Sequence, residues 1–370
     1  CVVDGRERVM LGSCNYLGLA THPSVIEGAR TALDAYGVGF AASHAHPLSK
    51  DAADGLERAL AEFLDVEEAI AFPSGFMASL AVIPALLEPL VGPLPCRRGT
   101  GTVLCDQDHH ASVLEGVKLA SASRVTFRHN DLEDLERRLL GADRRGPRVV
   151  LVEGVQSADG ELAPLAEVAE LCRQNGAIFY VDDAHGIGVL GQRGGGTLQH
   201  LGLCGKADLV MGSFGHALGG AGSFLAGRRD LIRYLRIAGR ASAVTFAMPA
   251  MMAGAMVRAL QVAREGELLR RRVRRNYEVL RSGLEELGFR LLGDGVLPAA
   301  LVSLGAEKLA IRFQQRLFEE GVLVTALHWP AVPKNTARIR VTPMVSHSDA
   351  HLAHALDAFA TVGRELNLIA

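Results

Sequence analysis

The sequence has no excess of charge of either sign and no long apolar run. Its 39 basic and 41 acidic residues leave a net charge of −2 over 370 residues, so the composition does not indicate a nucleic-acid partner, and no block of like charges suggests a tail. No apolar stretch approaches the ~18 residues that a membrane-spanning helix needs, and no signal peptide is expected. With 49% hydrophobic and 22% charged residues, the chain is expected to be globular, with two or three domains' worth of core.

Closely spaced cysteines are also absent. None of the six cysteines forms a C-x-x-C pair; they are Cys1, Cys14, Cys96, Cys105, Cys172 and Cys204. Scattered cysteines in a chain of this length are typical of reduced, mostly buried thiols, which predicts a cytoplasmic protein. We find no internal repeat and no low-complexity stretch.

Short apolar segments alternate with helical patterns through the middle of the chain. Residues 148–152 and 177–181 are β-branched and apolar, as expected for buried parallel strands. Residues 165–174 between them have helical spacing and end at Asn175-Gly176, a helix stop. Further strands are expected at 102–105, 208–211 and 224–226. This alternation predicts an α/β fold, with a mainly parallel sheet covered by helices on both faces.

The pattern changes after residue 231. Residues 254–287 are expected to form a long helix, and its arginine run, Arg270 to Arg275, is interpreted as a solvated face rather than an anion site. Short strands at 298–304, 322–325 and 338–342 then indicate a smaller α+β domain. The predicted division is an N-terminal segment 1–45, a large domain 46–250, a linking helix 251–285 and a small domain 286–370.

Short polar and glycine-containing motifs follow one another in a definite order. They are Asn15-Tyr16-Leu17-Gly18-Leu19 with His22-Pro23, Ser74-Gly75-Phe76, Asp106 through His110-Ala111-Ser112, His129-Asn130-Asp131, Ser157-Ala158-Asp159-Gly160, Asp182-Asp183-Ala184-His185, and Val332-Pro333 with Arg338-Ile339-Arg340. In this order they resemble the motifs of the α-oxoamine synthases, which are pyridoxal-phosphate (PLP) enzymes of fold type I. The resemblance covers nearly the whole chain.

The resemblance implies a fold, a reaction and partners. The fold is aminotransferase-like, with a large domain and a smaller C-terminal α+β domain. The reaction is the condensation of an amino acid with an acyl thioester, on coenzyme A or an acyl carrier protein, with loss of carbon dioxide. The resemblance also implies a homodimer whose sites use residues of both subunits.

Three residues suit the PLP ring. PLP needs a carboxylate at its pyridine nitrogen, and Asp182 follows a buried strand, where it would reach a ring at the carboxyl edge of the sheet. By the resemblance, His185 would hydrogen-bond the ring hydroxyl and His110 would stack on the ring face.

The cofactor phosphate and the substrate have their own candidates. Ser74, Gly75 and Phe76 open a helix, whose first N–H groups suit a phosphate. The resemblance adds Ser213 and Thr245, the latter reaching the phosphate of the partner subunit. It assigns the substrate carboxylate to Arg340, which shares a strand face with Arg338, and it adds the substrate-binding candidates Asn15, His44 and Cys14.

A lysine is missing where the family has one. The segment from Met211 to Gly220 resembles the loop whose lysine holds PLP as a Schiff base, but this chain has His216 there, and imidazole cannot form an imine. Gly215, His44 and Cys14 also depart from the family pattern. Gly215 and His44 argue against a single engineered change, because the neighbouring pattern differs too.

Three explanations remain open. PLP binds without a covalent bond and His216, with His110 and His185, performs acid–base catalysis; or the chain is a catalytically silent subunit; or PLP is absent and Cys14 with His44, His46 or His216 forms an acyltransferase site. A metal held by His44, His46 and Asp106 or Asp108 is the least favoured alternative, because no spacing supports it, and we expect no metal. The first explanation is favoured because Asp182, His185 and His110 are retained.

Overall fold

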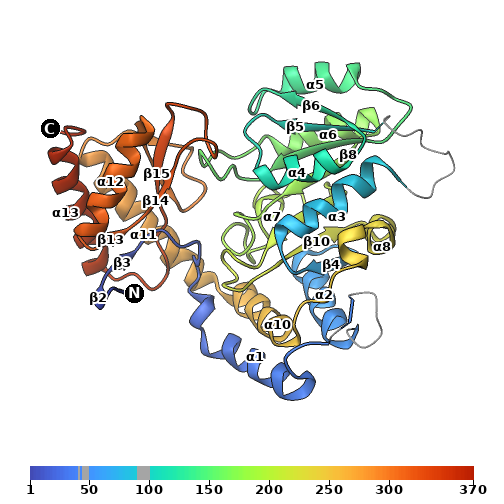
Figure 1. Cartoon of the computed structure of the whole chain (residues 1–370), viewed down its shortest axis with the longest axis horizontal. Helices are drawn as coiled ribbons and strands as arrows, with labels where there is room; N and C mark the ends of the chain where they lie inside the picture. Colours follow the sequence, from blue (N-terminus) through green and yellow to red (C-terminus); the bar gives the residue numbers. More distant parts are fainter. Residues whose placement is uncertain (41, 44–49, 90–100) are drawn as a thin grey trace. The chain divides into compact units, whose positions relative to one another are not determined.

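The computed structural model describes residues 1–40, 42–43, 50–89 and 101–370, which form two compact units (Figure 1). The large unit contains residues 19–155 and 163–265, and the small unit contains residues 1–18, 156–162 and 266–370. No helix in the described ranges is long and apolar enough to cross a membrane.

The large unit is built on a seven-stranded sheet. Its strands, in spatial order, are β4 (Glu68–Phe72), β10 (Ser223–Gly227), β9 (Leu209–Ser213), β8 (Ile178–Asp182), β7 (Arg148–Glu153), β5 (Thr102–Asp106) and β6 (Ser123–Phe127). Only β10 runs antiparallel to its neighbours. The predicted mainly parallel sheet is confirmed, and so are its strands at 102–105, 148–152, 177–181, 208–211 and 224–226, within two residues at each end.

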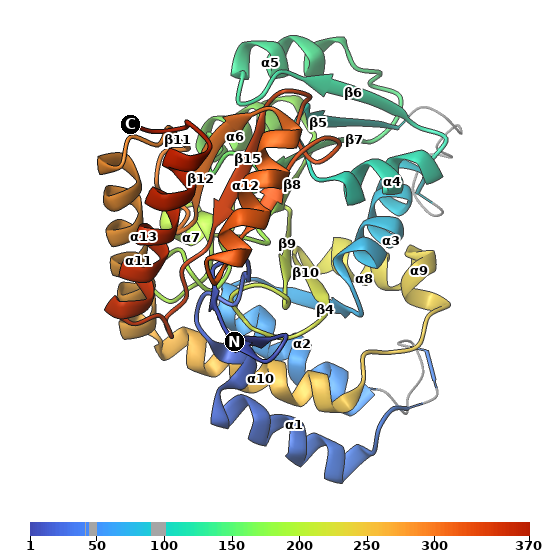
Figure 2. The ribbon, with the colours of Figure 1, turned by 60° about the vertical axis from the view of Figure 1, so that its left-hand side comes forward.

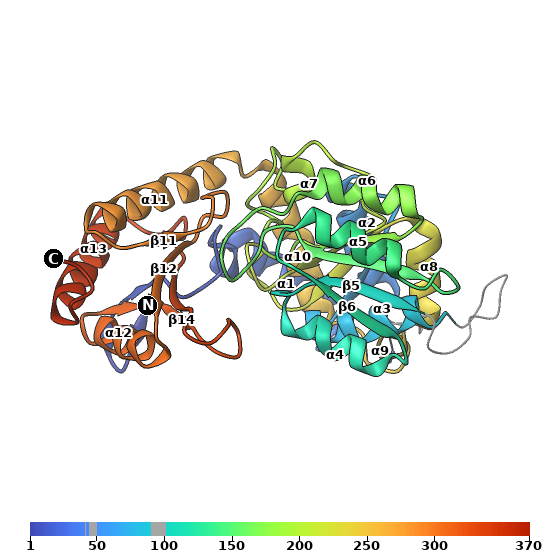
Figure 3. The same cartoon turned by 90° about the horizontal axis from the view of Figure 1, so that it is seen from above.

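Both faces of this sheet are covered by helices. Val149 and Leu151 of β7 join a core with α3 (Gly75–Leu87), α4 (Ala111–Leu119) and α8 (Arg229–Ala238). Val150 and Val152 point to the other face, toward α5 (Leu132–Gly141), α6 (Leu165–Asn175) and α7 (Thr197–His200). Figure 3 shows α6 and α7 on one side of the strands and α4 on the other. Successive residues of a strand point to opposite faces, which explains why the buried strands are apolar at every position.

Further helices of the large unit pack beside the sheet. They are α1 (Pro23–Tyr36), α2 (Lys50–Leu64), α9 (Arg240–Ala243) and α10 (Ala250–Glu265), with a short 3₁₀ turn at Leu19–Thr21. Helices α1 and α10 lie side by side (Figure 1). A Cβ at Gly28 would lie 2.6 Å from the Gly254 carbonyl, and one at Gly254 would lie 2.5 Å from the Gly28 carbonyl. Glycine at both positions therefore permits this close crossing.

The small unit is an antiparallel sheet covered by helices (Figure 2). Its strands are β11 (Leu291–Leu292), β12 (Ala300–Gly305), β15 (Ala337–Val341) and β14 (Thr325–Leu327), and its helices are α11 (Glu267–Glu286), α12 (Glu307–Glu319) and α13 (Asp349–Glu365). Phe289, Phe313 and Phe359 meet edge to face in its core. A hairpin of β1 (Val2–Val3) and β2 (Arg6–Glu7) begins the chain.

Two expected elements differ in detail. The helix expected over residues 254–287 is two helices, α10 and α11, separated at Gly266. The strand expected at 322–325 is β13 (Val322–Leu323), which pairs with β3 (Val9–Met10), followed by β14 in another sheet.

The arginine run on α11 is engaged within the small unit. Arg272 donates to the Val345 carbonyl at 3.0 Å, Arg274 donates to the Gly295 carbonyl at 2.6 Å, and Arg275 pairs with Asp349. These contacts hold the helix to its neighbours, and they give no support to an anion site.

Candidate functional site

Four polar side chains stand at the carboxyl edge of the large sheet. Asp106, Glu153, Asp182 and Ser213 are the last residues of β5, β7, β8 and β9. Parallel strands bring their carboxyl ends to one edge, which is where α/β proteins bind ligands. The strand pattern thus gathers residues that lie far apart in the sequence.

Asp182 is a buried carboxylate near the middle of this edge. Its side chain accepts the Ala184 N–H at 3.2 Å, and the residue is 6% exposed. Burial raises the pKa of this carboxyl, although the Ala184 N–H and the charge of His110 act in the opposite direction. A buried carboxylate is costly unless a cation joins it, so Asp182 suits a protonated pyridine nitrogen.

The backbone of the turn that carries His185 packs closely around the Asp183 carboxyl group. Its Oδ2 accepts the Thr197 N–H at 2.7 Å, and burial raises the pKa of this carboxyl to about 7. A Cβ at Gly186 or Gly196 would lie 2.1 or 2.0 Å from its oxygens. The glycines therefore let the backbone close around Asp183, whose role the sequence motif alone did not reveal.

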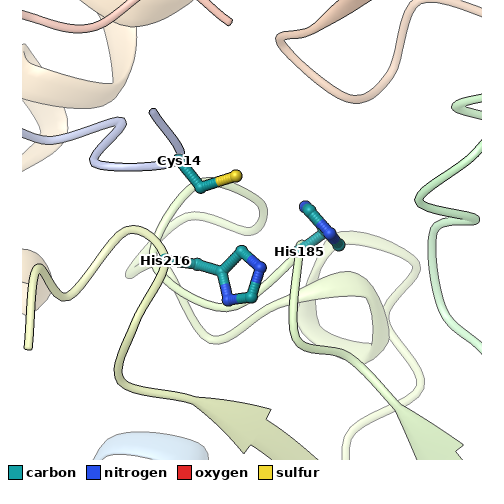
Figure 4. A group of neighbouring side chains, drawn as sticks. All are labelled: Cys14, His185 and His216. Atoms are coloured by element: carbon teal, nitrogen blue, oxygen red, sulfur yellow. The ribbon is translucent and has the colours of Figure 1, made fainter. Parts of the chain in front are cut away.

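His185 and His216 face one another in the large unit (Figure 4). Their ring centroids are 4.4 Å apart at 66°, an edge-to-face arrangement. His185 is buried and His216 is half-buried. Cys14, which Figure 4 also draws, belongs to the small unit.

His216 sits on a tight loop between β9 and β10. The Gly215 N–H donates to Ser213 Oγ at 3.1 Å, and the Gly219 N–H donates to the His216 carbonyl at 3.0 Å. Ser213 therefore orders the loop on which the predicted catalytic His216 stands.

His110 begins α4 as its N-cap. Its Nδ1 accepts the Ser112 N–H at 3.3 Å and lies 2.8 Å from Ser112 Oγ. Its backbone N–H donates to Glu153 Oε1 at 2.8 Å. The position of His110 is thus held through both its ring and its main chain. Ser112 is part of the His-Ala-Ser motif named from the sequence, but the motif gave it no role. Glu153 was not predicted, and the charged end of its strand is the only signal that points to it.

Ser74 begins α3 in the same way. Its Oγ accepts the Met77 N–H at 3.2 Å, and Gly75 and Phe76 form the first turn. Half of the Phe76 surface is exposed. The expected helix start is confirmed, and the start of a helix offers N–H groups to a phosphate.

Thr245 lies between α9 and α10, beside two exposed apolar residues. Thr245 itself is half-buried, whereas Val244 and Phe246 are 84% and 70% exposed.

The two strand arginines of the small unit have different surroundings. Arg338 is 9% exposed and donates to the carbonyls of Ala158 at 2.8 Å and Thr336 at 3.0 Å. Arg340, its neighbour on β15, has a buried Nε with no hydrogen-bond partner among the described residues. Arg338 is thus committed to the fold, whereas the Nε–H of Arg340 is left without a partner among the described residues.

Cys14 and Asn15 belong to the N-terminal part of the small unit. Burial raises the pKa of the Cys14 thiol, although Arg340 and a hydrogen bond with Tyr16 act in the opposite direction. Asn15 lies in a turn, where its carbonyl accepts the Gly18 N–H at 2.9 Å. A raised pKa disfavours the thiolate that nucleophilic catalysis needs.

The remaining candidates concern a metal. His44 and His46 lie outside the described residues, so the structure does not place them. Asp106 is already engaged: His129 Nδ1 is 3.0 Å from both of its oxygens, and the N–H groups of Asp108 and Asn130 donate to it at 2.9 and 3.1 Å. Burial acts to raise the pKa of Asp106, but these hydrogen bonds outweigh it and lower the pKa.

The residues of the large unit fit PLP except at one point. The carboxylate of Asp182, the imidazole of His110 and the start of α3 supply partners for a ring nitrogen, a ring face and a phosphate. Position 216 supplies an imidazole in place of a primary amine. The donor set therefore suits the cofactor but not its covalent attachment at this position.

Comparisons with known proteins agree in sequence and in structure. A family model described as aminotransferase class I and II matches residues 6–359. The 8-amino-7-oxononanoate synthases of Thermoanaerobacter pseudethanolicus and Geobacter sulfurreducens are 37% and 38% identical over 369 and 373 residues, covering 100% of this chain and 91% and 92% of those proteins.

Solved structures of serine palmitoyltransferases have the same fold. A variant from S. paucimobilis with a bound PLP–myriocin aldimine has a TM-score of 0.93 and 30% identity, covering 100% of this chain and 90% of that one. The enzyme of Sphingomonas wittichii has a TM-score of 0.92 and 30% identity, covering 99% of this chain and 90% of that one.

Proposed function

Because the chain belongs to the α-oxoamine synthase family of fold type I PLP enzymes, we propose that it condenses an amino acid with an acyl thioester at a site that holds PLP without a lysine bond. The family consists of PLP-dependent enzymes that transfer acyl groups with formation of a carbon–carbon bond. The relatives named 8-amino-7-oxononanoate synthase and serine palmitoyltransferase support these substrate classes, and loss of carbon dioxide belongs to the same proposal.

One observation carries the proposal. The site keeps the buried carboxylate of Asp182 and the hydrogen-bonded imidazole of His110 although the lysine position is His216. Burying a carboxylate costs free energy, and a cation paired with the carboxylate offsets that cost. We therefore favour a retained cofactor over a site that has lost it.

Each side chain of the site would have a separate role toward PLP. When bound, PLP supplies an electron-withdrawing ring that stabilises negative charge at the α-carbon of the amino acid. Asp182 would keep the ring nitrogen protonated, and the first turn of α3 would hold the phosphate. His110 would cover one ring face, and His185 would contact the ring hydroxyl.

His216 would move a proton in place of the missing amine. Histidine is the side chain whose ordinary pKa lies nearest to neutral pH, which suits it to accept and return a proton. Its neighbour His185 lies close enough to affect its charge.

Arg340 would bind the carboxylate of the amino acid. A guanidinium with unused N–H donors pairs well with a carboxylate, and Arg338 is already occupied by main-chain carbonyls.

Absorbance, dialysis and borohydride reduction test how the protein holds the cofactor. Protein mixed with PLP should show the absorbance of the free aldehyde and should release the cofactor on dialysis. Borohydride should leave no PLP attached to the protein. A peptide carrying reduced PLP on a lysine would overturn the non-covalent site.

Activity is tested on the pure chain. It is incubated with PLP, a panel of amino acids and acyl thioesters on coenzyme A or acyl carrier protein, and release of thiol and carbon dioxide is followed. Release only when PLP and an amino acid are both present supports the proposal. Thiol release without PLP that disappears in Cys14→Ala would instead support a cysteine acyltransferase, and no turnover with tight binding to a lysine-bearing relative would indicate a silent subunit.

Surface side chains and cysteines bear on the proposed assembly and location. Exposed apolar side chains around Thr245 support a homodimer, as the family resemblance implies. The five cysteines among the described residues are free thiols, which supports a cytoplasmic location.

A further inference from the structure

We infer that Ser112 is a positioning residue that keeps the proton of His110 on Nε2, so that this imidazole donates a hydrogen bond but does not act as a base. The assignment of the proton depends on contacts within the large unit. Only the use made of the ring rests on the proposed function.

The first step is the direction of one hydrogen bond. The Ser112 N–H lies 3.3 Å from His110 Nδ1, in the geometry of a helix cap. A backbone N–H can only donate, so Nδ1 must offer its lone pair. In the neutral ring, the proton is therefore on Nε2.

The Ser112 hydroxyl strengthens this preference. Its oxygen is 2.8 Å from the same Nδ1, and it accepts a hydrogen bond from Ser79 Oγ at 3.5 Å. Because Nδ1 already accepts the Ser112 N–H, the Ser112 hydroxyl can approach it only as a donor. Ser79 and Ser112 are 0% and 6% exposed, so the relay runs through the packed contact between α3 and α4.

The main chain around the ring is held as well. The His110 N–H donates to Glu153 Oε1 at 2.8 Å, which ties the start of α4 to the end of β7. A Cβ at Gly116 would lie 2.6 Å from the Ser79 carbonyl, so α4 passes close to α3 one turn further on. These contacts fix the backbone from which the His110 ring projects.

The consequence separates the roles of the site histidines. When the Nδ1 lone pair of a neutral imidazole already accepts a hydrogen bond, the ring can only donate one, through its Nε2–H. His110 therefore suits donation to an anionic oxygen of a ligand, whereas proton abstraction falls to His185 or His216. This deepens the proposed function, because it removes His110 from the acid–base residues that the sequence suggested.

The experiment observes the ring nitrogens without cofactor or reaction. Protein with ¹⁵N-labelled histidine is studied by long-range proton–nitrogen correlation near pH ~8.5, where an ordinary imidazole is neutral. The His110 signals are identified by their loss in His110→Gln. We expect a protonated Nε2 and an unprotonated Nδ1. Ser112→Ala should raise the ratio of the Nδ1–H form to the Nε2–H form about fivefold, the factor for one neutral hydrogen bond.

Two variants provide controls. Ser112→Thr, which keeps the hydroxyl, should restore the wild-type spectrum. Ser223→Ala removes another buried serine, on β10, and should leave the His110 signals unchanged. A wild-type ring protonated on Nδ1, or no change in Ser112→Ala, would overturn the inference.

A variant that fails to fold and a chain that lacks activity can both be distinguished from a failure of the inference. If Ser112→Ala does not fold, Ser79→Ala removes the donor that orients the Ser112 hydroxyl, and an unchanged ratio there overturns the inference. A changed ratio in a chain that condenses no substrates would leave the positioning role standing and reject the proposed function.

Discussion

At the scale of single residues, a histidine at position 216 can transfer a proton but cannot hold an aldehyde as an imine. If the proposal is right, His216→Ala should lower turnover by roughly 10²–10⁴-fold, the usual contribution of a general acid–base. His216→Lys should hold PLP against dialysis and shift its absorbance. The exposed His200 supplies the matched control, since His200→Ala should change neither property. Unchanged turnover in His216→Ala would remove the catalytic role.

Arg340 and Arg338 should respond differently to replacement by alanine. Arg340→Ala should raise the KM for the amino acid by roughly 10- to 150-fold, because a hydrogen bond to a charged group contributes ~1.5–3 kcal/mol. Its unfolding midpoint should stay close to that of the wild type. Arg338→Ala should instead lower the unfolding midpoint, because the Ala158 and Thr336 carbonyls lose their donor. Kinetics and denaturant unfolding of both variants test this, and equal KM effects would contradict the assignment.

Sequence motifs pointed to the proposed site residues more readily than to the residues that hold them in place. Asp182 and His110 could be proposed because a carboxylate after a strand and a His-Ala-Ser motif are visible in the sequence. Glu153 could not be paired with His110, because 43 residues separate them and only the neighbouring strand ends bring them together. The choice between Arg338 and Arg340 also depended on carbonyls supplied by other segments.

At the scale of elements, the turn after β8 is built around a buried carboxyl group whose pKa is raised. The pKa of Asp183 is raised to about 7 by burial, from an ordinary 3.8. The folded chain therefore binds a proton that the unfolded chain releases between these values, and stability falls as pH rises through this window.

Asp183→Asn cannot ionise and should reduce this fall. Urea unfolding of cofactor-free protein at several pH values between 4 and 8 measures the effect, which should reach a few kcal/mol at the upper end, since one pKa unit is about 1.4 kcal/mol. Asp182 has a raised pKa of the same sign and should leave a residual slope in both proteins. Asp34→Asn, at an exposed position, should keep the wild-type slope. An equally steep slope in Asp183→Asn would contradict the prediction.

Hydrophobic patterning predicted the buried strands because their apolar residues face helices on both sides. It did not locate the break at Gly266, since the helical pattern continues across it from α10 into α11. Hydrophobic patterning also did not show that residues 322–325 belong to two strands. Strand partners decide which sheet each residue joins, and β13 pairs with β3 near the start of the chain.

At the scale of the whole molecule, each unit gathers segments that are distant in sequence. The small unit takes in residues 156–162, whose Ala158 carbonyl accepts a hydrogen bond from Arg338 on β15. Linear domain boundaries therefore could not describe it, although the order of fold elements and the presence of a smaller C-terminal α+β part were predictable.

Exposed apolar side chains on the large unit bear on how the chain assembles. Val244 and Phe246 flank Thr245, and Ile237, seven residues before Val244 in the sequence, is 81% exposed on α8. Large apolar side chains grouped on a surface are typical of an interface. We expect a homodimer that buries them, with each side chain contributing ~1.5–3 kcal/mol to association. Introducing charge at two of these positions, in Val244→Asp with Phe246→Asp, should then weaken the dimer by roughly 100-fold or more.

Light scattering during size exclusion, over a range of protein concentrations, measures this shift. Leu119→Asp, which places a charge at another exposed apolar residue on α4, should leave the dimer intact. If Thr245 contacts the phosphate bound by the partner subunit, the monomeric double variant should also retain PLP less well than the control. A stable dimer in the double variant would show that the interface lies elsewhere, and full retention of PLP by a monomer would separate the cofactor site from the assembly.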